Sequence, residues 1–466
     1  PAHIFPYNLL LIIILDVKIN TNTNQLKNSM PPNEMITTEC RICGNTTLVP
    51  VVDLGNQCLS GIFPNKNAPN PSRSPLQLIK CDNSENKNVC GLLQLRQNAN
   101  LDEMYGSTYG YHSSISPSMV SHLAEKVDGL INFVCPKKGE IVLDIGCNDG
   151  TMLNLFGRTG MKRIGIDPSS EKFKDQFDTD IDVICDFFSE IAVRKIIAEE
   201  ECKIITSIAM FYDIDDPLSF MREIRSLLAQ DGIWALELSY LPLMLKNLTY
   251  DQICHEHVTY LGLKQMEWLA NRTGLQIIDI SFNFMNGGSF YLYVSRDDSV
   301  YKPNNSKLKE TLRSENCLHE LEYYERFNNR ILTHRDELLA MLNILSQTGK
   351  KIYGYGASTK GNVILNLCGI DKTILPLICD ANPEKHGLVT PGTKIDIISK
   401  DQMRLDRPDY LIVFIWHFRK EILESEVDYI MNGGTMIFVL PRVHIVNKDN
   451  YEHYINAGFE ELSFSL

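Results

Sequence analysis

The sequence predicts an α/β protein in which two Rossmann-like domains follow a small cysteine-containing module. Residues 140–169 contain an apolar run, a glycine turn, apolar positions at helical spacing and a second run that ends in Asp167. Residues 351–380 repeat this pattern around Gly356 and end in Asp380. Each pattern is typical of a strand, a turn and a helix, and repeated units of this kind form mostly parallel, doubly wound sheets.

The composition limits the class of protein. The chain has 466 residues, enough for two to four domains, and a formal net charge of -13. An acidic chain without a basic stripe argues against a nucleic-acid partner. Its 13 cysteines are mostly scattered, which favours a reducing compartment, so we expect a cytoplasmic protein.

The first residues are expected to contribute nothing to function. The apolar run 9–15 is far shorter than the roughly 20 residues that span a bilayer, and it lacks the flanks of a targeting signal, so we expect no membrane association. An Asn/Thr-rich piece follows. We expect residues 1–36 to be a disordered extension, so a chain starting at Met30 or Met35 would function equally.

Four cysteines near the N-terminus are candidate metal ligands. Cys40 and Cys43 form a C-x-x-C turn, and Cys81 and Cys90 follow at a wider spacing. Four thiolates suit a structural zinc site, with the residues between Cys81 and Cys90 as an inserted loop. Cys58 competes as the fourth ligand, and unligated core thiols are the simpler alternative. A redox role fits less well, because a redox C-x-x-C opens a helix after a strand.

The glycine turn after residues 141–143 favours a ligand with a cationic centre and a ribose. It lacks G-x-G-x-x-G, and Asp144 opens it, which disfavours a dinucleotide. Asp167 ends the next strand, where an acid usually holds ribose hydroxyls. Asp186 and Phe187 follow a third strand and could bind and cover an adenine ring. The turn resembles the first motif of class I S-adenosylmethionine methyltransferases; any βαβ unit with a tight turn is the alternative.

The segment 250–258 carries the candidate chemistry. His255, Glu256 and His257 follow one another between two predicted helices. In an extended or turn conformation the two histidines would share a side, and a histidine beside a carboxylate can remove a proton α to a carbonyl. We expect its ionisation near neutral pH. A metal site lacks the spacing of H-E-x-x-H, and a purely structural polar cluster is a further alternative.

Candidate substrate contacts lie on both sides of this segment. Tyr109 and Tyr111 fall in a glycine- and serine-rich loop, and Gly288 lies between two predicted strands, where the backbone can approach a ligand. In the second glycine turn, Lys360 stands one turn into the helix and could help to receive a phosphate, with Asn362 nearby. A long helical pattern over residues 306–346 separates the two sheet domains.

With these motifs in view, the chain resembles the three-part C-methyltransferases that act on nucleotide-linked 4-keto-6-deoxyhexoses. The resemblance runs from about Cys40 to the end and is carried by the four cysteines, the segment 109–114, the turn 144–150, the segment 251–257, the turn 355–362 and Pro391-Gly392-Thr393. It implies a zinc-binding module, a class I methyltransferase (Rossmann-like) domain and a Rossmann-like C-terminal domain. We accordingly expect an extension at 1–36, a zinc-binding module at 37–100, a methyltransferase domain at 101–300, a linker helix at 301–348 and a C-terminal domain at 349–466.

The resemblance also implies the site residues. S-adenosyl-L-methionine is expected at Asp144, Gly146, Asn148, Asp149, Asp167, Asp186 and Phe187; the small-molecule substrate, a nucleotide sugar, at Tyr109, Tyr111, Gly288, Lys360 and Asn362; and Zn(2+) at Cys40, Cys43, Cys81 and Cys90. His257, supported by Glu256, would remove the C3 proton of the sugar, and His255 is its competitor. Oxyanion donors would be Tyr109, Tyr111 or an amide near Gly288.

Two positions depart from the family pattern. Cys254 stands where sugar enzymes often have tyrosine, and Asp213 where some have histidine. Both would face the acceptor, so acceptor identity is the open part of this interpretation. Alternatives are an O- or N-methyltransferase with the same donor domain, and a non-catalytic zinc-anchored scaffold.

Overall fold

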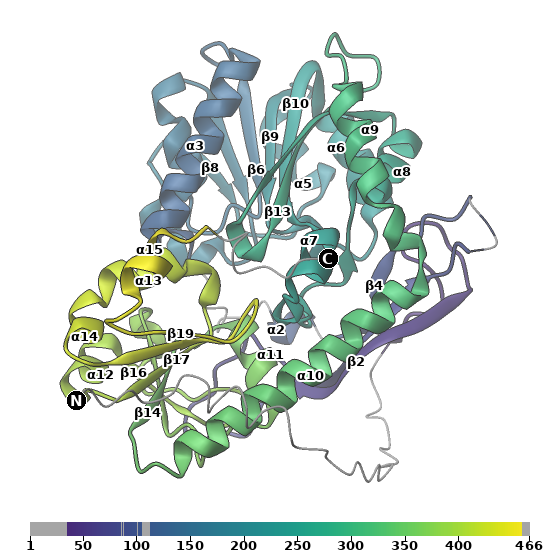
Figure 1. Ribbon diagram of the computed structural model, residues 1–466. Coiled ribbons are helices and arrows are strands. Elements are labelled where there is room, and N and C mark those ends of the chain that lie inside the picture. Colours follow the sequence, from purple (N-terminus) through teal and green to yellow (C-terminus); the bar gives the residue numbers. More distant parts are fainter. Residues whose placement is uncertain (1–34, 85, 87, 100, 105–111, 459–466) are drawn as a thin grey trace.

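Parallel strands with helices on both faces build two of the three parts of the chain in the computed structural model (Figure 1), which describes residues 35–84, 86, 88–99, 101–104 and 112–458. The predicted α/β class with two Rossmann-like domains is therefore confirmed. The expectation for residues 1–36 falls almost entirely outside the described residues, as do Tyr109 and Tyr111.

The N-terminal module is a small sheet that recruits a strand from the middle of the chain. Its own elements are β1 (Met35–Ile36), β2 (Leu48–Cys58), β3 (Arg73–Cys81), β4 (Leu93–Leu95), β5 (Gln97–Asn98) and α2 (Leu101–Met104). The four-stranded sheet has the order β11-β4-β3-β2, and β11 (Thr259–Tyr260) directly follows the candidate catalytic segment. Thr259 pairs with Gln94 and Tyr260 with Leu93. The module thus anchors the end of that segment, and its sheet extends beyond the expected boundary at residue 100.

The central domain has a seven-stranded sheet of order β12-β13-β10-β9-β6-β7-β8. The strands β6 to β10 are parallel, while β13 runs antiparallel to β10 and to β12. Their bounds are β6 (Ile141–Ile145), β7 (Lys162–Ile166), β8 (Ile181–Ile184), β9 (Cys202–Ile208), β10 (Leu228–Ser239), β12 (Leu275–Asn283) and β13 (Ser289–Arg296). Chain order reverses between β6 and β9, and open α/β sheets bind ligands at the carboxyl ends of strands at such a point.

Two groups of helices cover this sheet. Helices α3 (Pro117–Val134) and α4 (Thr151–Leu155) share a buried apolar cluster with one face. The other face packs against α5 (Glu190–Ile197), α6 (Pro217–Leu227) and α8 (Leu263–Thr273). Residues 230–232 lie inside β10, where the pairing to β9 shifts register between Leu228 and Ile233.

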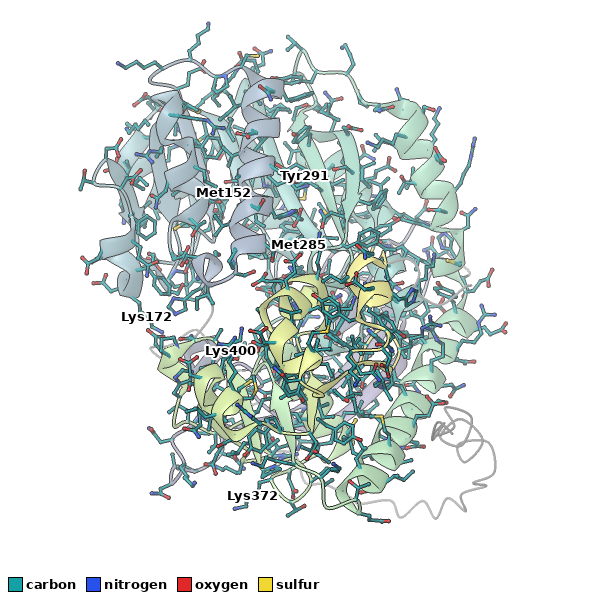
Figure 2. The ribbon with its side chains drawn as sticks, turned by 60° about the vertical axis from the view of Figure 1, so that its left-hand side comes forward. Met152, Lys172, Met285, Tyr291, Lys372 and Lys400 are labelled. Atoms are coloured by element: carbon teal, nitrogen blue, oxygen red, sulfur yellow. The ribbon has the colours of Figure 1, made fainter. Side chains whose placement is uncertain are left out.

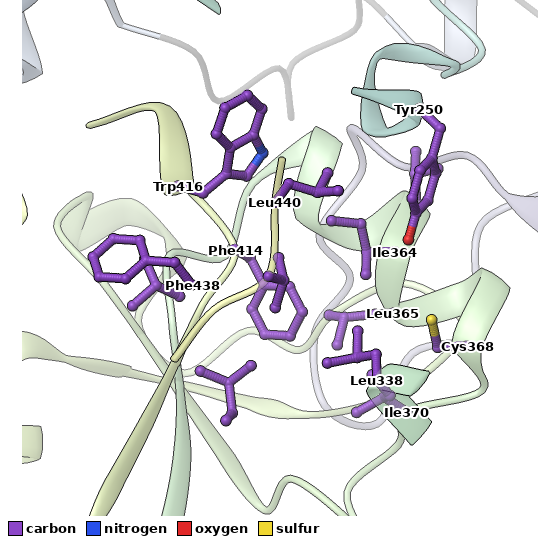
Figure 3. Packing of buried hydrophobic residues seen from close by; sticks show 14 of the residues in the cluster. Tyr250, Leu338, Ile364, Leu365, Cys368, Ile370, Phe414, Trp416, Phe438 and Leu440 are labelled. Carbon is purple, nitrogen blue, oxygen red and sulfur yellow. The ribbon is translucent and has the colours of Figure 1, made fainter. Parts of the chain in front are cut away.

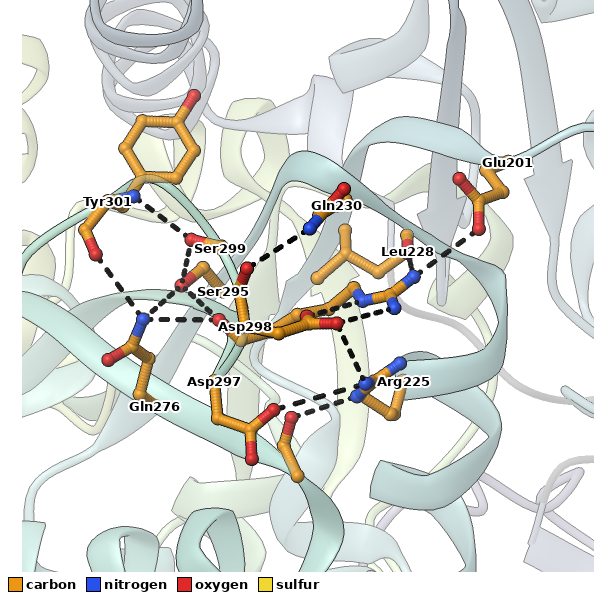
Figure 4. A network of polar contacts seen from close by, with 12 residues as sticks. Glu201, Arg225, Leu228, Gln230, Gln276, Ser295, Asp297, Asp298, Ser299 and Tyr301 are labelled. Atoms are coloured by element: carbon orange, nitrogen blue, oxygen red, sulfur yellow. Dashed lines mark hydrogen bonds and ion pairs between the residues drawn. The ribbon is translucent and has the colours of Figure 1, made fainter.

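The edge of the sheet opposite the strand carboxyl ends is closed by ion pairs (Figure 4). Arg296, at the end of β13, pairs with Asp298 at 2.9 Å and with Glu201 at 3.4 Å, while Arg225 of α6 reaches Asp298 at 3.6 Å. These partly exposed pairs join three elements at this edge.

The long helical pattern between the sheets is two helices rather than one. Helix α9 (Asn305–Ser314) ends before Glu315, and α10 (Leu321–Ser346) starts after a 3-10 turn at Asn316–His319. The break has a tertiary cause, because the buried carboxylate of Glu315 accepts hydrogen bonds from the N–H groups of Leu263 at 2.6 Å and Lys264 at 2.9 Å, where it caps α8. In Figure 1, α10 runs along the N-terminal module and the C-terminal domain.

The C-terminal domain has a six-stranded sheet of order β16-β15-β14-β17-β18-β19, parallel except for β19. Its strands are β14 (Ile352–Tyr355), β15 (Leu377–Asp380), β16 (Asp396–Ser399), β17 (Tyr410–Val413), β18 (Thr435–Phe438) and β19 (His444–Val446). Its helices are α11 (Thr359–Cys368), α12 (Lys400–Asp406), α13 (Arg419–Ser425), α14 (Val427–Met431) and α15 (Tyr451–Asn456).

The core of the C-terminal domain includes part of the central domain. Tyr250 is fully buried in the same apolar cluster as Leu338 of α10 and Cys368 of α11 (Figure 3). Its hydroxyl contacts His334 Nδ1 at 3.0 Å, and His334 Nε2 donates to the carbonyl of Val439 at 2.7 Å. The start of the candidate catalytic segment is therefore held by α10 and the C-terminal sheet. None of the helices in the described ranges has the length and apolar character needed to cross a bilayer.

Candidate active site

One cavity of ≈ 900 Å³ collects residues from all three parts of the chain. Its walls include Gly146 and Asp167 of the central domain, His257 of the central segment, Gly61 of the N-terminal module and Lys360 of the C-terminal domain. Ligand pockets commonly have volumes of about 300–1,000 Å³. The cavity is thus large enough for more than one small molecule.

The donor-type end of the cavity is built on the turn after β6. Gly146 has φ +76°, and an added Cβ would lie 3.1 Å from Met210 Cγ, so the backbone approaches the cavity closely. Asp167 accepts hydrogen bonds from the N–H of Asn148 at 3.0 Å and from the N–H and hydroxyl of Ser169 at 2.6 Å each. These neutral donors orient the carboxylate without compensating its charge, as a ribose-binding acid requires.

Two further acids of this turn have different surroundings. Asp144 lines the cavity and accepts a hydrogen bond from Thr206 Oγ1 at 2.6 Å; burial raises the pKa of Asp144 to about 7. Asp149 instead caps the start of α4 through the N–H and hydroxyl of Thr151 and accepts from the N–H of Ser114 at 2.8 Å. It does not belong to the cavity wall formed by the described residues.

The pair expected to bind and cover an adenine is divided. Phe187 is 50 % exposed and lines the cavity together with Phe188. Asp186 is exposed, accepts a hydrogen bond from the N–H of Phe187 at 2.8 Å and lies off the wall that the described residues form. The aromatic rings can cover a ligand, whereas Asp186 shapes the loop.

A buried histidine–carboxylate pair on this wall escaped the sequence analysis. Glu237 of β10 lines the cavity, and His122 Nε2 of α3 lies 2.9 Å from both of its oxygens. Asn283 Nδ2 donates to the same carboxylate at 2.8 Å. A glutamate inside the apolar run of residues 233–238 was the available signal, because a buried acid needs partners. The histidine could not be found, since it lies 115 residues away.

The two histidines of the central segment have opposite tautomers. His257 Nδ1 lies 2.8 Å from the carbonyl oxygen of Gln252, and His255 Nε2 lies 3.0 Å from that of Ser74. A carbonyl only accepts, so each of these nitrogens carries the proton. In His257 the basic nitrogen is therefore Nε2, and in fully buried His255 it is Nδ1. Both histidines line the cavity.

The structure changes the expected electrostatics of His257. Burial first and Lys360 second lower its pKa to about 3, and burial lowers the pKa of His255 to about 4. The base form thus dominates at neutral pH, and the expected ionisation moves to acid pH. The ring of His257 is hydrogen-bonded to the carbonyl of Gln252 and not to Glu256. The side chains of consecutive residues point in different directions, so Glu256 does not orient the neighbouring ring. A backbone carbonyl leaves no signal in the sequence.

Glu256 faces the cavity through a gap left by a glycine. A Cβ on Gly61 would collide with Glu256 Oε1, and Glu256 Oε2 is buried without a hydrogen-bond partner among the described residues. Burial raises the pKa of Glu256. Cys254 and Asp213, the two departures from the family pattern, also line the cavity.

The predicted substrate contacts are only partly on the wall. Lys360 lines the cavity, and its Nζ donates to Asn286 Oδ1 at 3.1 Å. Asn362 is fully buried away from the described cavity wall and donates to the carbonyl of Ser60 at 2.8 Å, so it joins α11 to the N-terminal module. Gly288 also lies off this wall, and its N–H donates to the carbonyl of Met285 at 3.0 Å. Its amide therefore cannot serve an oxyanion.

The four N-terminal cysteines meet as predicted. Their sulfur atoms all lie within 4.8 Å of one another, with Cys40 and Cys90 3.3 Å apart and Cys43 and Cys81 3.6 Å apart. Thiolates around a zinc ion at about 2.3 Å would stand roughly 3.8 Å apart, so the group fits a tetrahedral metal. Cys58 contacts Arg73 instead. Among the described residues this is the only cluster of three or more such ligands, and it does not include the central histidines.

Three family models match the chain in the order of its parts. Residues 40–105 match a model described as "Putative zinc binding domain", residues 119–280 a "Methyltransferase domain", and residues 284–441 a "C-methyltransferase C-terminal domain". The middle match covers most of the seven-stranded sheet, and the last includes Lys360.

Curated relatives are similar to different extents. C-methyltransferase NovU of Streptomyces niveus is 28% identical over 421 residues, which cover 88% of this chain and 97% of the relative. A ubiquinone biosynthesis O-methyltransferase of Actinobacillus pleuropneumoniae is 25% identical over 126 residues, 26% of this chain and 51% of the relative. The similarity to the first spans all three parts, whereas that to the second spans about one domain.

The solved structures match a little over a third of the chain. The mitomycin 7-O-methyltransferase MmcR has a TM-score of 0.31 and 11% identity, covering 38% of this chain and 54% of that one. An S-adenosylmethionine-dependent methyltransferase from Clostridium acetobutylicum has a TM-score of 0.30 and 12% identity, covering 38% and 92%. The fold assignment rests instead on strand order. Together with the family models and the relative that spans all three parts, it identifies the protein as an S-adenosylmethionine-dependent methyltransferase.

Proposed function

We propose that the protein methylates C3 of a nucleotide-linked 4-keto-6-deoxyhexose through an enolate, with His257 as the base. The observation that carries this proposal is the hydrogen bond from His257 Nδ1 to the carbonyl of Gln252, which makes Nε2 the basic nitrogen of a ring on the cavity wall. A neutral histidine with a fixed tautomer has a free nitrogen that can accept a proton α to a carbonyl.

The proposed steps balance as follows. His257 Nε2 takes the C3 proton, the electrons of that C–H bond form the enolate double bond, and the carbonyl oxygen becomes an oxyanion. S-adenosylmethionine supplies an electrophilic methyl group, and its sulfonium becomes a neutral thioether. The carbonyl is restored when C3 gains the methyl, and His257 releases its proton to water. Positioning alone can contribute about 7–11 kcal/mol to such a step.

Different residues of the cavity wall are proposed to hold the two ligands. Asp167, Gly146 and Asn148 are proposed to hold the donor, with Asp144 near its cationic part and Phe187 over its adenine. Glu256 lines the cavity and its Oε2 is buried without a hydrogen-bond partner among the described residues, so it is proposed to bind an acceptor hydroxyl. Cationic Lys385 lines the same cavity, which favours an anionic acceptor such as a nucleotide sugar.

The four-cysteine group is proposed to hold a structural zinc ion. Asn45 Nδ2 lies 3.4 Å from Cys81 Sγ, an outer contact that supports a thiolate ligand. Metal analysis of the purified protein should give about one zinc per chain. Changing both Cys40 and Cys43 to serine should impair folding rather than chemistry, since structural zinc contributes directly to folding; metal-free protein with unchanged stability would exclude this role.

The substrate is tested with S-adenosylmethionine labelled in its methyl group and a panel of nucleotide-linked 4-keto-6-deoxyhexoses. The label should appear in a carbon-bound methyl at C3. Wild-type protein without donor should also exchange the C3 proton for deuterium in D2O. A methyl group on oxygen or nitrogen, without exchange at any carbon, would favour the O- or N-methyltransferase alternative.

A further inference from the structure

Three hydrogen bonds connect the C-terminal domain to the candidate base. Lys360 Nζ donates to Asn286 Oδ1 at 3.1 Å. The carbonyl of Asn286 accepts from Gln252 Nε2 at 3.0 Å, and the carbonyl of Gln252 accepts from His257 Nδ1 at 2.8 Å. Lys360, Asn286 and His257 all line the cavity. The amine of the lysine and the ring of the histidine therefore belong to one connected stretch of wall.

The ammonium group of Lys360 is desolvated and lacks a paired carboxylate. Among the described residues its hydrogen-bond acceptor is a neutral amide oxygen, and no carboxylate forms an ion pair with it. The carboxyl group that acts on it most strongly, Asp251, accepts a hydrogen bond from Trp416 Nε1 at 2.8 Å. A cation removed from water without an ion partner is unfavourable unless a ligand supplies an oxygen.

The expected oxyanion donors are not found on the described cavity wall. Tyr109 and Tyr111 lie outside the described residues, and the N–H of Gly288 is already bonded to the carbonyl of Met285. Lys360 is a charged donor on the wall that also carries the base. A preformed cation at the position where negative charge develops stabilises the transition state without reorganisation.

We infer that Lys360 binds the acceptor carbonyl oxygen and stabilises the oxyanion of the enolate. This inference rests on the proposed function. Lys360 keeps its proton throughout: the carbonyl electrons move onto oxygen as His257 takes the carbon-bound proton, and they return when the new carbon–carbon bond forms. The C-terminal domain thereby contributes a catalytic residue, while Lys385 at 2.8 Å from the carbonyl of Ala357 remains with the anionic part of the acceptor.

The test compares Lys360→Met, Lys360→Arg and Lys385→Met with wild type. Lys372→Met is the surface control, because Lys372 is exposed at the end of the C-terminal domain away from the central domain (Figure 2). Deuterium exchange at the acceptor carbon is measured at saturating acceptor without donor. The affinities for UDP and dTDP are measured by calorimetry, because these nucleotides probe the binding of the anionic part of the acceptor.

Lys360→Met should slow exchange by roughly 10²–10³-fold, the range for removal of one oxyanion donor, and should change nucleotide affinity less than about threefold. Lys360→Arg should retain part of the exchange, since it keeps a charged donor. Lys385→Met should slow exchange far less than Lys360→Met. Lys372→Met should resemble wild type.

Three results would overturn the inference. A large loss of UDP or dTDP affinity with unchanged exchange would make Lys360 a phosphate ligand. Equal slowing of exchange by Lys360→Met and Lys385→Met would indicate that positive charge on the cavity wall acts non-specifically, without a direct contact from Lys360 to the carbonyl oxygen. Trapping of the acceptor on Lys360 by borohydride would replace the ion contact with a Schiff base. If wild type itself exchanges no acceptor proton, it is the proposed function that fails.

Discussion

The two glycine turns of the molecule have the same local design but differ in the charge compensation of the acid beside them. Gly146 follows β6 with φ +76°, and Gly356 follows β14 with φ +91°. In the central domain the acid after the next strand, Asp167, is held by neutral donors. In the C-terminal domain the corresponding Asp380 lies 3.8 Å from Lys385 Nζ. One turn therefore presents an uncompensated carboxylate, while the acid of the other is compensated.

This difference indicates that the second Rossmann-like unit is not a second donor site. A ribose needs an acid with free accepting capacity, and Asp380 is off the described cavity wall and beside a cation. What the C-terminal turn adds to the cavity is Lys360. Repetition of a strand, a glycine turn and a helix thus specifies backbone geometry, whereas the charged residues around the turn select the ligand.

The largest expected effect concerns the segment between the two turns. His257→Asn should lower turnover by roughly 10²–10⁴-fold, because it removes the nitrogen that takes the proton, while donor affinity stays close to wild type. Exchange at the acceptor carbon and donor calorimetry measure the two effects. His255→Asn is the comparison, since His255 is bonded to Ser74 and fully buried. Loss of exchange in His255→Asn with exchange retained in His257→Asn would swap the two roles.

The contrast between Asp167 and Asp380 can be tested directly. Asp167→Ala should weaken donor binding by about 1.5–3 kcal/mol, because charge-assisted hydrogen bonds to the ribose are lost. Asp380→Ala should leave donor affinity unchanged. Calorimetry with S-adenosylhomocysteine measures both variants, and an unchanged dissociation constant in Asp167→Ala would remove this residue from the donor site.

The two glycines should tolerate a methyl group differently. A Cβ at Gly356 would lie 2.5 Å from Cγ1 of Ile415, whereas at Gly146 the nearest atom is Met210 Cγ at 3.1 Å. Both positions have positive φ, which costs about 1 kcal/mol for alanine, and a collision with a β-branched side chain adds about 1–3 kcal/mol. Thermal unfolding should therefore show a larger loss in Gly356→Ala. Equal losses would mean that Ile415 moves aside as easily as the methionine.

The smallest expected effect is a proton released at the central turn. Asp144 has its pKa raised to about 7 by burial, so its carboxyl is largely protonated at pH 6. A cationic donor favours the carboxylate, so binding should release up to one proton per chain at pH 6 and donor affinity should rise with pH toward neutrality. Calorimetry in buffers of different ionisation enthalpy measures the release. Asp144→Asn should abolish it; persistence would assign the proton elsewhere.

The sequence by itself determined the features that depend on local geometry. Apolar runs, glycines and helical spacing are enough to place the two turns and Asp167, because each involves residues within one βαβ unit. The meeting of Cys40 and Cys43 likewise follows from their spacing in one turn. Gly146, Asp167 and Lys360, which these local patterns singled out, all line the cavity.

Only the tertiary structure decided which distant groups meet. Cys90 rather than Cys58 completes the cysteine group, and Glu237 is joined to His122. The tautomer of His257 depends on a backbone carbonyl. Asn362 was expected in the substrate site, but its side chain donates a hydrogen bond to the carbonyl of Ser60. These outcomes arise from packing between segments 50 to 302 residues apart or from main-chain atoms common to all residues. Neither leaves a pattern in the order of side chains, so the physical basis for them exists only in the folded chain.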